Sequence, residues 1–195
     1  QLHGHAVVAV LSRIGKVAAA TTATALIERF GVGRIVFTGV AGGLAPGVLR
    51  GDVVVADAFL QHDMDASPLF PRYEVPLYGQ QRFASDPPLT DQLEAAVRQA
   101  LPTVRVHRGL VVSGDRFVSS AAESRALQLA LPEALCVEME GAAFAQVCHD
   151  YGVPFAAVRT VSDRADDEAA GDFLQFIEEV ASRQSAAIID AWLAG

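Results

Sequence analysis

Runs of β-branched and apolar residues alternate along this chain with segments that carry apolar residues at helical spacing. This alternation limits the possible folds more than any other feature. The β-branched runs hold few polar residues, which is typical of strands buried on both faces of a sheet. Strands that alternate with helices indicate helices packed around a mostly parallel sheet. We therefore predict an α/β fold, a single domain with a mixed, mostly parallel central β-sheet flanked by helices in three layers.

The pattern predicts six strands and five helices. The strands are Ala6–Leu11, Arg34–Thr38, Asp52–Phe59, Arg108–Ser113, Leu135–Glu140 and Phe155–Val161. Four of the helices are Gly15–Phe30, Leu89–Leu101, Ala121–Leu131 and Ala142–Tyr151. The fifth is an amphipathic C-terminal helix with an apolar face made of Phe173, Phe176, Ile177, Val180, Ala187, Ile188 and Ala191. Residues 61–88 include five prolines and are predicted to be a long irregular loop, of a length that is usually functional.

Composition limits the partners of the chain. Its 195 residues suit one domain, and its net charge of −8 argues against nucleic acid or an anionic membrane as the main partner. No apolar run reaches the roughly 18 residues that span a bilayer, and no secretory signal is recognised. We expect a cytoplasmic protein whose two cysteines, Cys136 and Cys148, are buried or half-buried thiols.

Glycines, carboxylates and an aromatic residue follow four of the predicted strands. These positions are the turn 39–43, the segment 114–118, Glu138 with Glu140, and Asp163. Ligands of α/β sheets bind beyond the carboxyl ends of the strands, so the coincidence predicts a site. Each signal also has a purely structural interpretation, because glycines make tight turns and acids cap helices. The glycine spacing matches neither the P-loop nor the dinucleotide fingerprint.

The segment "VEMEG" places Glu138 and Glu140 inside an otherwise apolar run. Alternation along a strand would put both side chains on one face, where two buried like charges repel. Backbone amides at 141–143, at the start of the next helix, could stabilise one of them. A structural ion pair is the alternative to a functional role.

Seven segments, in this order, resemble the 5′-methylthioadenosine/S-adenosylhomocysteine nucleosidases of the nucleoside phosphorylase superfamily. They are "SRIGKVAAA", "TGVAGGL", "RGDVVVAD", "HDMDAS", "RGLVVSGDRFV", "CVEMEGAAFAQVC" and "VPFAAVRTVSD". The resemblance runs from about Val7 to the C-terminal helix. It implies a nucleoside phosphorylase-like fold and hydrolysis of the N-glycosidic bond, which releases adenine and a 5-thioribose product without metal or organic cofactor.

The resemblance also implies roles for individual residues. Catalysis is assigned to Asp163, which would contact adenine N7, to Glu140, which would bind the ribose, and to Arg159 near the attacking water. Substrate binding is assigned to Phe117, Val118, Met139, Glu138, Ser162, Ala41 and Gly42. For Glu138 a supporting role within the site is the more natural interpretation.

These residue types suit the chemistry. Glycoside cleavage passes through an oxocarbenium-like transition state, and an ionised Glu140 at the sugar hydroxyls places negative charge where positive charge develops. A protonated Asp163 that donates toward N7 makes adenine a better leaving group. That role requires a raised pKa of Asp163, which burial at the end of an apolar strand can supply.

Two features depart from the family pattern. The family begins with a further strand and an acidic cluster that holds the water-activating glutamate, and nothing before Gln1 matches them, so we expect the domain 1–195 to be N-terminally incomplete. Val40 also stands where many members have serine. The segment 62–65, "HDMD", is not expected to bind metal, because its acids are isolated from other ligands. By the resemblance, it leads into the loop that lines the 5′-tail pocket and the homodimer contact, and the alternative is a surface loop with scattered apolar residues. The candidate apolar contacts of this loop are Leu69, Phe70, Tyr73 and Pro76.

Three functions stay open at this point. The first is the hydrolase acting on a small-molecule thionucleoside. The second is a phosphate-dependent purine nucleoside phosphorylase, which needs cationic groups around the phosphate, and the glycine-rich turn contains no arginine. The third is a non-catalytic nucleoside-binding module, for which an acid at N7 would be unnecessary.

Overall fold

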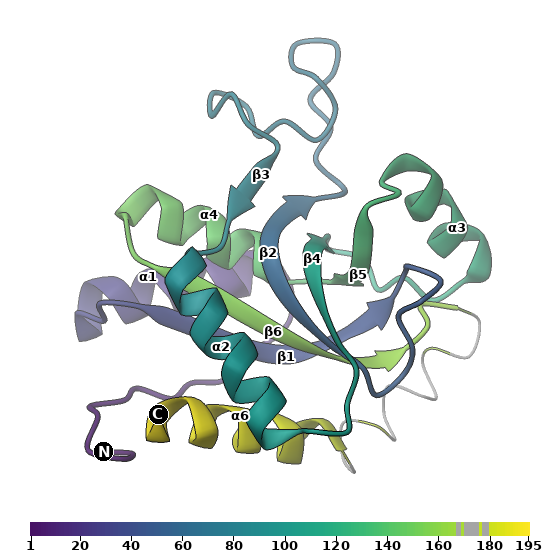
Figure 1. Cartoon of the computed structure of the whole chain (residues 1–195). Coiled ribbons are helices and arrows are strands. Elements are labelled where there is room, and N and C mark those ends of the chain that lie inside the picture. The colour runs from purple at the N-terminus through teal and green to yellow at the C-terminus, as the bar shows by residue number, and fades with distance from the viewer. Residues whose placement is uncertain (167–168, 170–175, 177–179) are drawn as a thin grey trace.

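Figure 1 shows a computed structural model of the chain, which describes residues 1–166, 169, 176 and 180–195. The described strands are β1 (Ile35–Gly43), β2 (Val53–Gln61), β3 (Arg82–Ala84), β4 (Val106–Ser113), β5 (Ala134–Glu138) and β6 (Phe155–Asp163). The described helices are α1 (Lys16–Phe30), α2 (Pro87–Ala100), α3 (Ala121–Ala130), α4 (Gly141–Tyr151) and α6 (Ser182–Ala194). They form the single α/β domain with a mixed sheet that the sequence predicts.

The sheet closes on itself, and in this respect the prediction of a three-layer sandwich is wrong. The strand order is β3-β2-β4-β5-β1-β6, and β2 also pairs with β6, so five strands form a barrel with β3 attached outside it. The β1–β6, β2–β4 and β4–β5 pairs are parallel, whereas β1–β5 and β2–β6 are antiparallel. Irregularities in register at Ala41/Gly42, Ala56/Ala58 and Leu110/Val111 accompany the closure, because bulges increase strand twist.

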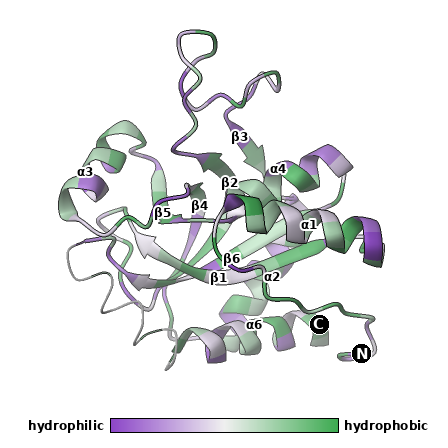
Figure 2. Ribbon diagram, turned by 180° about the vertical axis from the view of Figure 1, so that it is seen from behind, coloured by the Kyte–Doolittle hydropathy of each residue, from purple (hydrophilic) through white to green (hydrophobic). Residues whose placement is uncertain are grey.

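Helices cover the outside of the barrel in pairs. Helix α1 packs on α4, and α2 packs on α6, as Figure 1 shows on two sides of the strands. Each pair encloses an apolar cluster against the strands, and a third cluster lies between β4, β5 and α3. Figure 2 shows mainly hydrophobic residues along the barrel strands. The strands therefore hold their carboxyl ends in fixed positions, because their middles are packed from outside.

The segment Ala6–Leu11, predicted as a strand, has no regular structure. Its apolar side chains are exposed, Leu11 by 88%. A strand needs a neighbour for its backbone groups, and none of the described ladders includes residues 6–11. The other predicted strands and helices are confirmed, although β1 continues past Thr38 to Gly43 and the C-terminal helix is described as α6 only from Ser182. Of the residues predicted on the apolar face of the C-terminal helix, Phe173 and Ile177 lie outside the described residues.

Local signals explain where the helices begin and end. Asp86 accepts a hydrogen bond from the backbone N–H of Leu89 at 2.9 Å and so caps α2, which starts with two prolines. Gly31 and Gly152 end α1 and α4 in the left-handed conformation. The residue at the N-cap of α1 is Gly15, which has no side chain to cap the helix. Another segment must therefore satisfy the first amides of α1.

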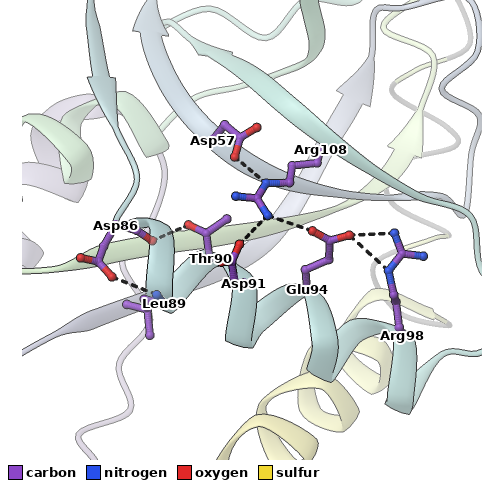
Figure 3. Close-up of polar contacts among 8 residues, drawn as sticks. All are labelled: Asp57, Asp86, Leu89, Thr90, Asp91, Glu94, Arg98 and Arg108. Atoms are coloured by element: carbon purple, nitrogen blue, oxygen red, sulfur yellow. Dashed lines mark hydrogen bonds and ion pairs between the residues drawn. The ribbon is translucent and has the colours of Figure 1, made fainter.

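The loop between β2 and α2 projects from the barrel, as Figure 1 shows, and contains the short strand β3. Below it, α2 is fastened to the barrel by an arginine cluster, drawn in Figure 3. Arg108 on β4 donates to Asp57 at the bulge of β2, and to Asp91 and Glu94 on α2, over 2.6, 2.6 and 3.1 Å. We call these four residues the Arg108 cluster.

Both cysteines are buried and free, as predicted. Burial raises the pKa of the Cys148 thiol to about 12 and raises that of Cys136 further above its ordinary value. Among the described residues no helix is long and apolar enough to cross a membrane.

Candidate active site

The carboxyl ends of four strands meet at one end of the barrel. Gly42 on β1 pairs with Val137 on β5 and with Asp163 on β6, while Ser113 at the end of β4 pairs with Glu138 at the end of β5. The segments singled out in the sequence thus come together although they lie far apart along the chain. Ala41 and Gly42 lie in the last part of β1, buried between the other strands.

Gly42 permits this close approach. A Cβ atom at this position would lie 2.8 Å from Oδ1 of Asp163 and 2.9 Å from Cβ of Ala165. Both distances are too short for real atoms, so a larger residue at position 42 would push the Asp163 carboxylate away. The segment 39–43, predicted as a glycine-rich turn, is instead the last part of β1, and Gly42 leaves room there for the Asp163 carboxyl.

Glu138 is the most heavily bonded carboxylate of the site. It is buried and accepts from Nη2 of Arg159 at 2.7 Å, and from the backbone amides of Glu140 and Gly141 at 2.9 to 3.1 Å. The Ser113 hydroxyl also donates to it. The helix amides thus stabilise one of the two acids, as predicted, and the ion pair that was the alternative for this motif is present at Glu138. Glu138 therefore holds Arg159 and the turn before α4 in position.

Arg159 is 1% exposed and lies over the ring of Phe37, with 4.0 Å between the guanidinium carbon and the ring centroid. Only Nη2 contacts Glu138, while Nε and Nη1 have no hydrogen-bond partner among the described residues. Buried donors of a cation that the protein leaves unpaired are costly unless an ordered water or a bound molecule pairs them. Nη1 faces Gly39, where a Cβ atom would lie at 3.0 Å.

Glu140 lies outside the strand that was predicted to hold it, because β5 ends at Glu138 and Glu140 is the N-cap of α4. The Glu138 carboxylate binds the next amides and turns the chain there, so the two acids do not share a strand face. Glu140 is half-buried, and its Oε1 accepts from the backbone N–H of Gly15 at 2.9 Å. Burial, together with the charge of Glu138, raises the pKa of Glu140 above its ordinary value.

Asp163 ends β6 and is 2% exposed. Its Oδ2 accepts from the hydroxyl of Ser162, and its Oδ1 accepts from the backbone N–H of Ala165, both at 2.7 Å. These two contacts fix the carboxyl plane beside Gly42. A helix-capping role was the structural alternative for the acids that follow strands. Asp115 does cap a helix, but the helix is α1, which lies far away in the sequence: Asp115 accepts from the backbone N–H of Lys16 at 2.7 Å.

The loop after β4 carries the remaining predicted residues. Phe117 is 39% exposed, which argues against the core role that was its alternative, while Val118 is buried. Met139 is half-buried between the two glutamates. Sequence reasoning missed Gly15 and Ser113, which contact Glu140 and Glu138 from positions 125 and 25 residues away. For Ser113 a signal existed, since it ends a strand predicted to border the site.

The site does not coincide with the large cavity of about 1160 Å³ that lies between residues 5–12, β1 and α6, and none of the predicted site residues lines that cavity. No group of three or more histidine, cysteine, aspartate or glutamate side chains that could hold a metal occurs in the described part of the chain. The chemistry available at the strand ends is therefore that of carboxylates, an arginine and an aromatic ring.

Comparisons with known proteins show the family to which the chain belongs. The model of the phosphorylase superfamily matches residues 1–194. A 5′-methylthioadenosine/S-adenosylhomocysteine nucleosidase from Neisseria meningitidis, solved with methylthio-immucillin-A, is 38% identical with a TM-score of 0.88, and the match covers 94% of this chain and 79% of that one. The nucleosidase from S. pneumoniae with a transition-state inhibitor is 37% identical with a TM-score of 0.91, covering 100% and 83%. A futalosine hydrolase of Helicobacter pylori is 33% identical with a TM-score of 0.86, covering 93% and 76%.

The chain belongs to the phosphorylase superfamily. Within it, the resemblance to the 5′-methylthioadenosine/S-adenosylhomocysteine nucleosidases that was inferred from seven sequence motifs is confirmed.

Proposed function

We propose that this protein is a nucleosidase that hydrolyses the N-glycosidic bond of 5′-methylthioadenosine and S-adenosylhomocysteine, releasing adenine and the 5-thioribose product. One observation carries the proposal: Gly42 lies between the ends of β5 and β6, so the turn that holds Glu140 and the carboxyl of Asp163 flank the same strand. Nucleosidases at 37 and 38% identity add support.

In the proposed reaction the two carboxyl groups have opposite tasks. Ionised Glu140 accepts hydrogen bonds from the ribose hydroxyls and stabilises the oxocarbenium-like transition state. Protonated Asp163 donates toward N7 of adenine as the bond to the sugar breaks, which is worth about 10²–10⁴-fold in rate. Phe117 stacks on the purine, Val118 offers its backbone to the purine edge, and Met139 packs under the sugar.

Arg159 supplies the positive charge of the proposed site. Its unpartnered Nε and Nη1 are free to bind an oxygen of the attacking water or of the sugar. Glu138 holds Nη2 of the same guanidinium, so it acts as a support for Arg159. Buried donors of this kind would also suit a phosphate, which keeps the phosphorylase as the second candidate function.

The test is adenine release from a panel of 5′-methylthioadenosine, S-adenosylhomocysteine, 5′-deoxyadenosine and futalosine, with and without inorganic phosphate. We expect release from the first two without phosphate. Dependence on phosphate, with ribose 1-phosphate as product, would establish the phosphorylase instead. Binding of nucleosides without release of adenine would favour the non-catalytic module.

Asp163→Asn provides the matching test of the mechanism. The variant keeps the shape of the side chain but cannot donate as a carboxylic acid, so we expect kcat to fall about 10²–10⁴-fold while inhibitor binding persists. Asp91→Asn, in the Arg108 cluster between α2 and β4 and away from the site, is the control and should retain full activity. An Asp163→Asn enzyme with normal turnover would remove Asp163 from the mechanism.

We further propose a cytoplasmic homodimer that uses no metal or organic cofactor and serves methionine salvage. Leu69 and Leu77 in the projecting loop are 84% and 91% exposed, which suits a contact with a second copy near the 5′-tail pocket. Sedimentation of the wild type and of a Leu69→Glu, Leu77→Glu variant tests the dimer, which the substitutions should dissociate.

A further inference from the structure

Lys16 is the only lysine in a sequence that contains 15 lysine and arginine residues. It occupies the first position of α1, and its side chain is 17% exposed. Nζ of Lys16 donates to Oδ1 of Asp63 at 2.7 Å and to Oε1 of Gln61 at 3.0 Å. A compact ammonium on a four-carbon stem fits this enclosed position, where a planar guanidinium fork would have different geometry.

Lys16, Asp63 and Asp115 form a closed ring of polar contacts. The backbone N–H of Lys16 donates to Oδ1 of Asp115 at 2.7 Å, and the backbone N–H of Asp115 donates to Oδ2 of Asp63 at 2.9 Å. The Lys16 ammonium completes the ring at Oδ1 of Asp63. Each residue thus contacts the other two, and the ring joins α1 to the segments after β2 and β4.

Electrostatics favour the ionised form of this ring. Burial acts to raise the pKa of Asp63, but the Lys16 ammonium and the Asp115 amide outweigh it and hold that pKa below its ordinary value. Asp63 is therefore a carboxylate at neutral pH. Both of its oxygens are engaged, so the ring has a defined geometry.

The ring is connected to the proposed site at two points. Gly15, next to Lys16, donates its N–H to Oε1 of Glu140 at 2.9 Å. Gly15 has φ of 97° and a Cβ atom there would lie 3.2 Å from Oδ1 of Asp115, so this link requires glycine. At the other point, Phe117 follows Asp115 by two residues in the same loop. The carboxylate proposed for the ribose and the aromatic proposed for the purine are thus both attached to the ring.

We propose that Lys16 is a positioning residue of this site: its ring with Asp63 and Asp115 sets the place of Glu140 relative to the loop that carries Phe117. Lys16 itself does not touch the substrate in this scheme, and it acts through Gly15 and Asp115. The expected effect on KM rests on the proposed function. The coupling between the three residues of the ring can be measured without enzymatic turnover.

The kinetic test compares Lys16→Met, Asp63→Asn and the double variant with the wild type on 5′-methylthioadenosine. We expect each single variant to raise KM about tenfold with a smaller change in kcat, because ribose and purine contacts form in the bound ground state. The double variant should be no worse than either single one, since one break opens the ring. Arg108→Met, which removes a cation with several carboxylate partners away from the site, is the control and should keep the wild-type KM.

A spectroscopic test uses the single lysine. Protein labelled with [15N]lysine gives one backbone amide resonance, that of the Lys16 N–H bonded to Asp115. We expect Asp63→Asn to shift this resonance, adenine to shift it in the wild type, and Arg108→Met to leave it in place. The inference would be overturned if the variants kept the wild-type KM and the Lys16 resonance did not shift when adenine is added.

The two tests separate this inference from the proposed function. If the wild type releases adenine from no nucleoside, the proposed function fails, and the response of the Lys16 resonance to Asp63→Asn and to adenine still decides whether the ring is coupled to a base site. If the enzyme is active but the ring variants lose only thermal stability at unchanged KM, Lys16 is a structural residue and the inference fails.

Discussion

Two arginine clusters in this molecule differ in how their charges are matched. Arg159 is 1% exposed, contacts one carboxylate and leaves two donor nitrogens without a partner among the described residues. Arg108 has a side chain 34% exposed and contacts the three carboxylates shown in Figure 3. The cluster with more ion pairs is partly exposed to water, and the cluster with fewer is buried.

The difference teaches that the number of ion pairs does not rank the two clusters by importance. Exposed pairs are screened by water and contribute about 0–1 kcal/mol, whereas breaking a buried pair leaves an uncompensated charge and costs about 3–5 kcal/mol. The incomplete pairing of Arg159 is compatible with a reactive site, and the complete pairing of the Arg108 cluster is compatible with attachment of a helix.

The largest effect is expected for Arg159→Met. The substitution leaves the buried Glu138 carboxylate without its cationic partner, and we expect the free energy of unfolding to fall by about 3–5 kcal/mol in urea denaturation. Adding Glu138→Gln to this variant should recover part of the lost free energy of unfolding, because the unpaired buried charge is then removed. A loss below about 1 kcal/mol for the single variant would place Arg159 in the same class as Arg108.

Glu140→Gln should separate activity from stability. We expect kcat/KM for adenine release to fall about 10²–10³-fold, since the negative charge at the ribose is lost. The free energy of unfolding at pH 7 should stay equal or rise, because burial and Glu138 disfavour the Glu140 carboxylate. Paired urea titrations and initial rates check both expectations, and a clear loss of stability would show that the charge itself supports the fold.

The pH dependence follows from the raised pKa of Glu140. Since the ionised form is the active one, kcat/KM should decline as pH falls through that raised pKa, at a higher pH than for an exposed glutamate. For folding the sign is reversed: the contribution of Glu140 to stability is full below its unfolded-state pKa and is lost as pH rises through the folded-state value. Glu140→Gln should remove that slope, and an unchanged slope would assign it to another group.

The smallest effect is expected for Arg108→Met. Water and salt screen its three carboxylate contacts, so we expect a loss of about 1 kcal/mol or less in the free energy of unfolding, with full enzymatic activity. The loss should shrink further at 1 M salt. A loss as large as that of Arg159→Met would erase the contrast between the clusters.

Local patterns in the sequence were sufficient to predict most elements but not the closure of the sheet. The β2–β6 pairing joins Val53–Val55 to Val158–Thr160, and nothing in either strand's own pattern records it. The strand predicted at Ala6–Leu11 shows the same limit, because a continuous apolar, β-branched run forms a strand only where a partner strand exists. Buried strands with strong β-branched patterns, such as β2 and β6, were predicted well.

The site was predicted from what ends each strand, and its supports were missed. Asp163, Glu140 and Phe117 are unusual residues for their positions and drew attention for that reason. Gly15 and Ser113 are ordinary residues whose role comes from contacts across the chain. The end of β5 was also predicted two residues late, because the bonds from Glu138 to the following amides override the alternation.

The two enclosed thiols give this molecule an internal reporter. Cys136 and Cys148 present neither a reachable sulfur nor a thiolate to an alkylating reagent while the barrel is intact. Iodoacetamide incorporation should therefore proceed only through opening of the core, so its rate in native buffer measures how often the core around the two thiols opens.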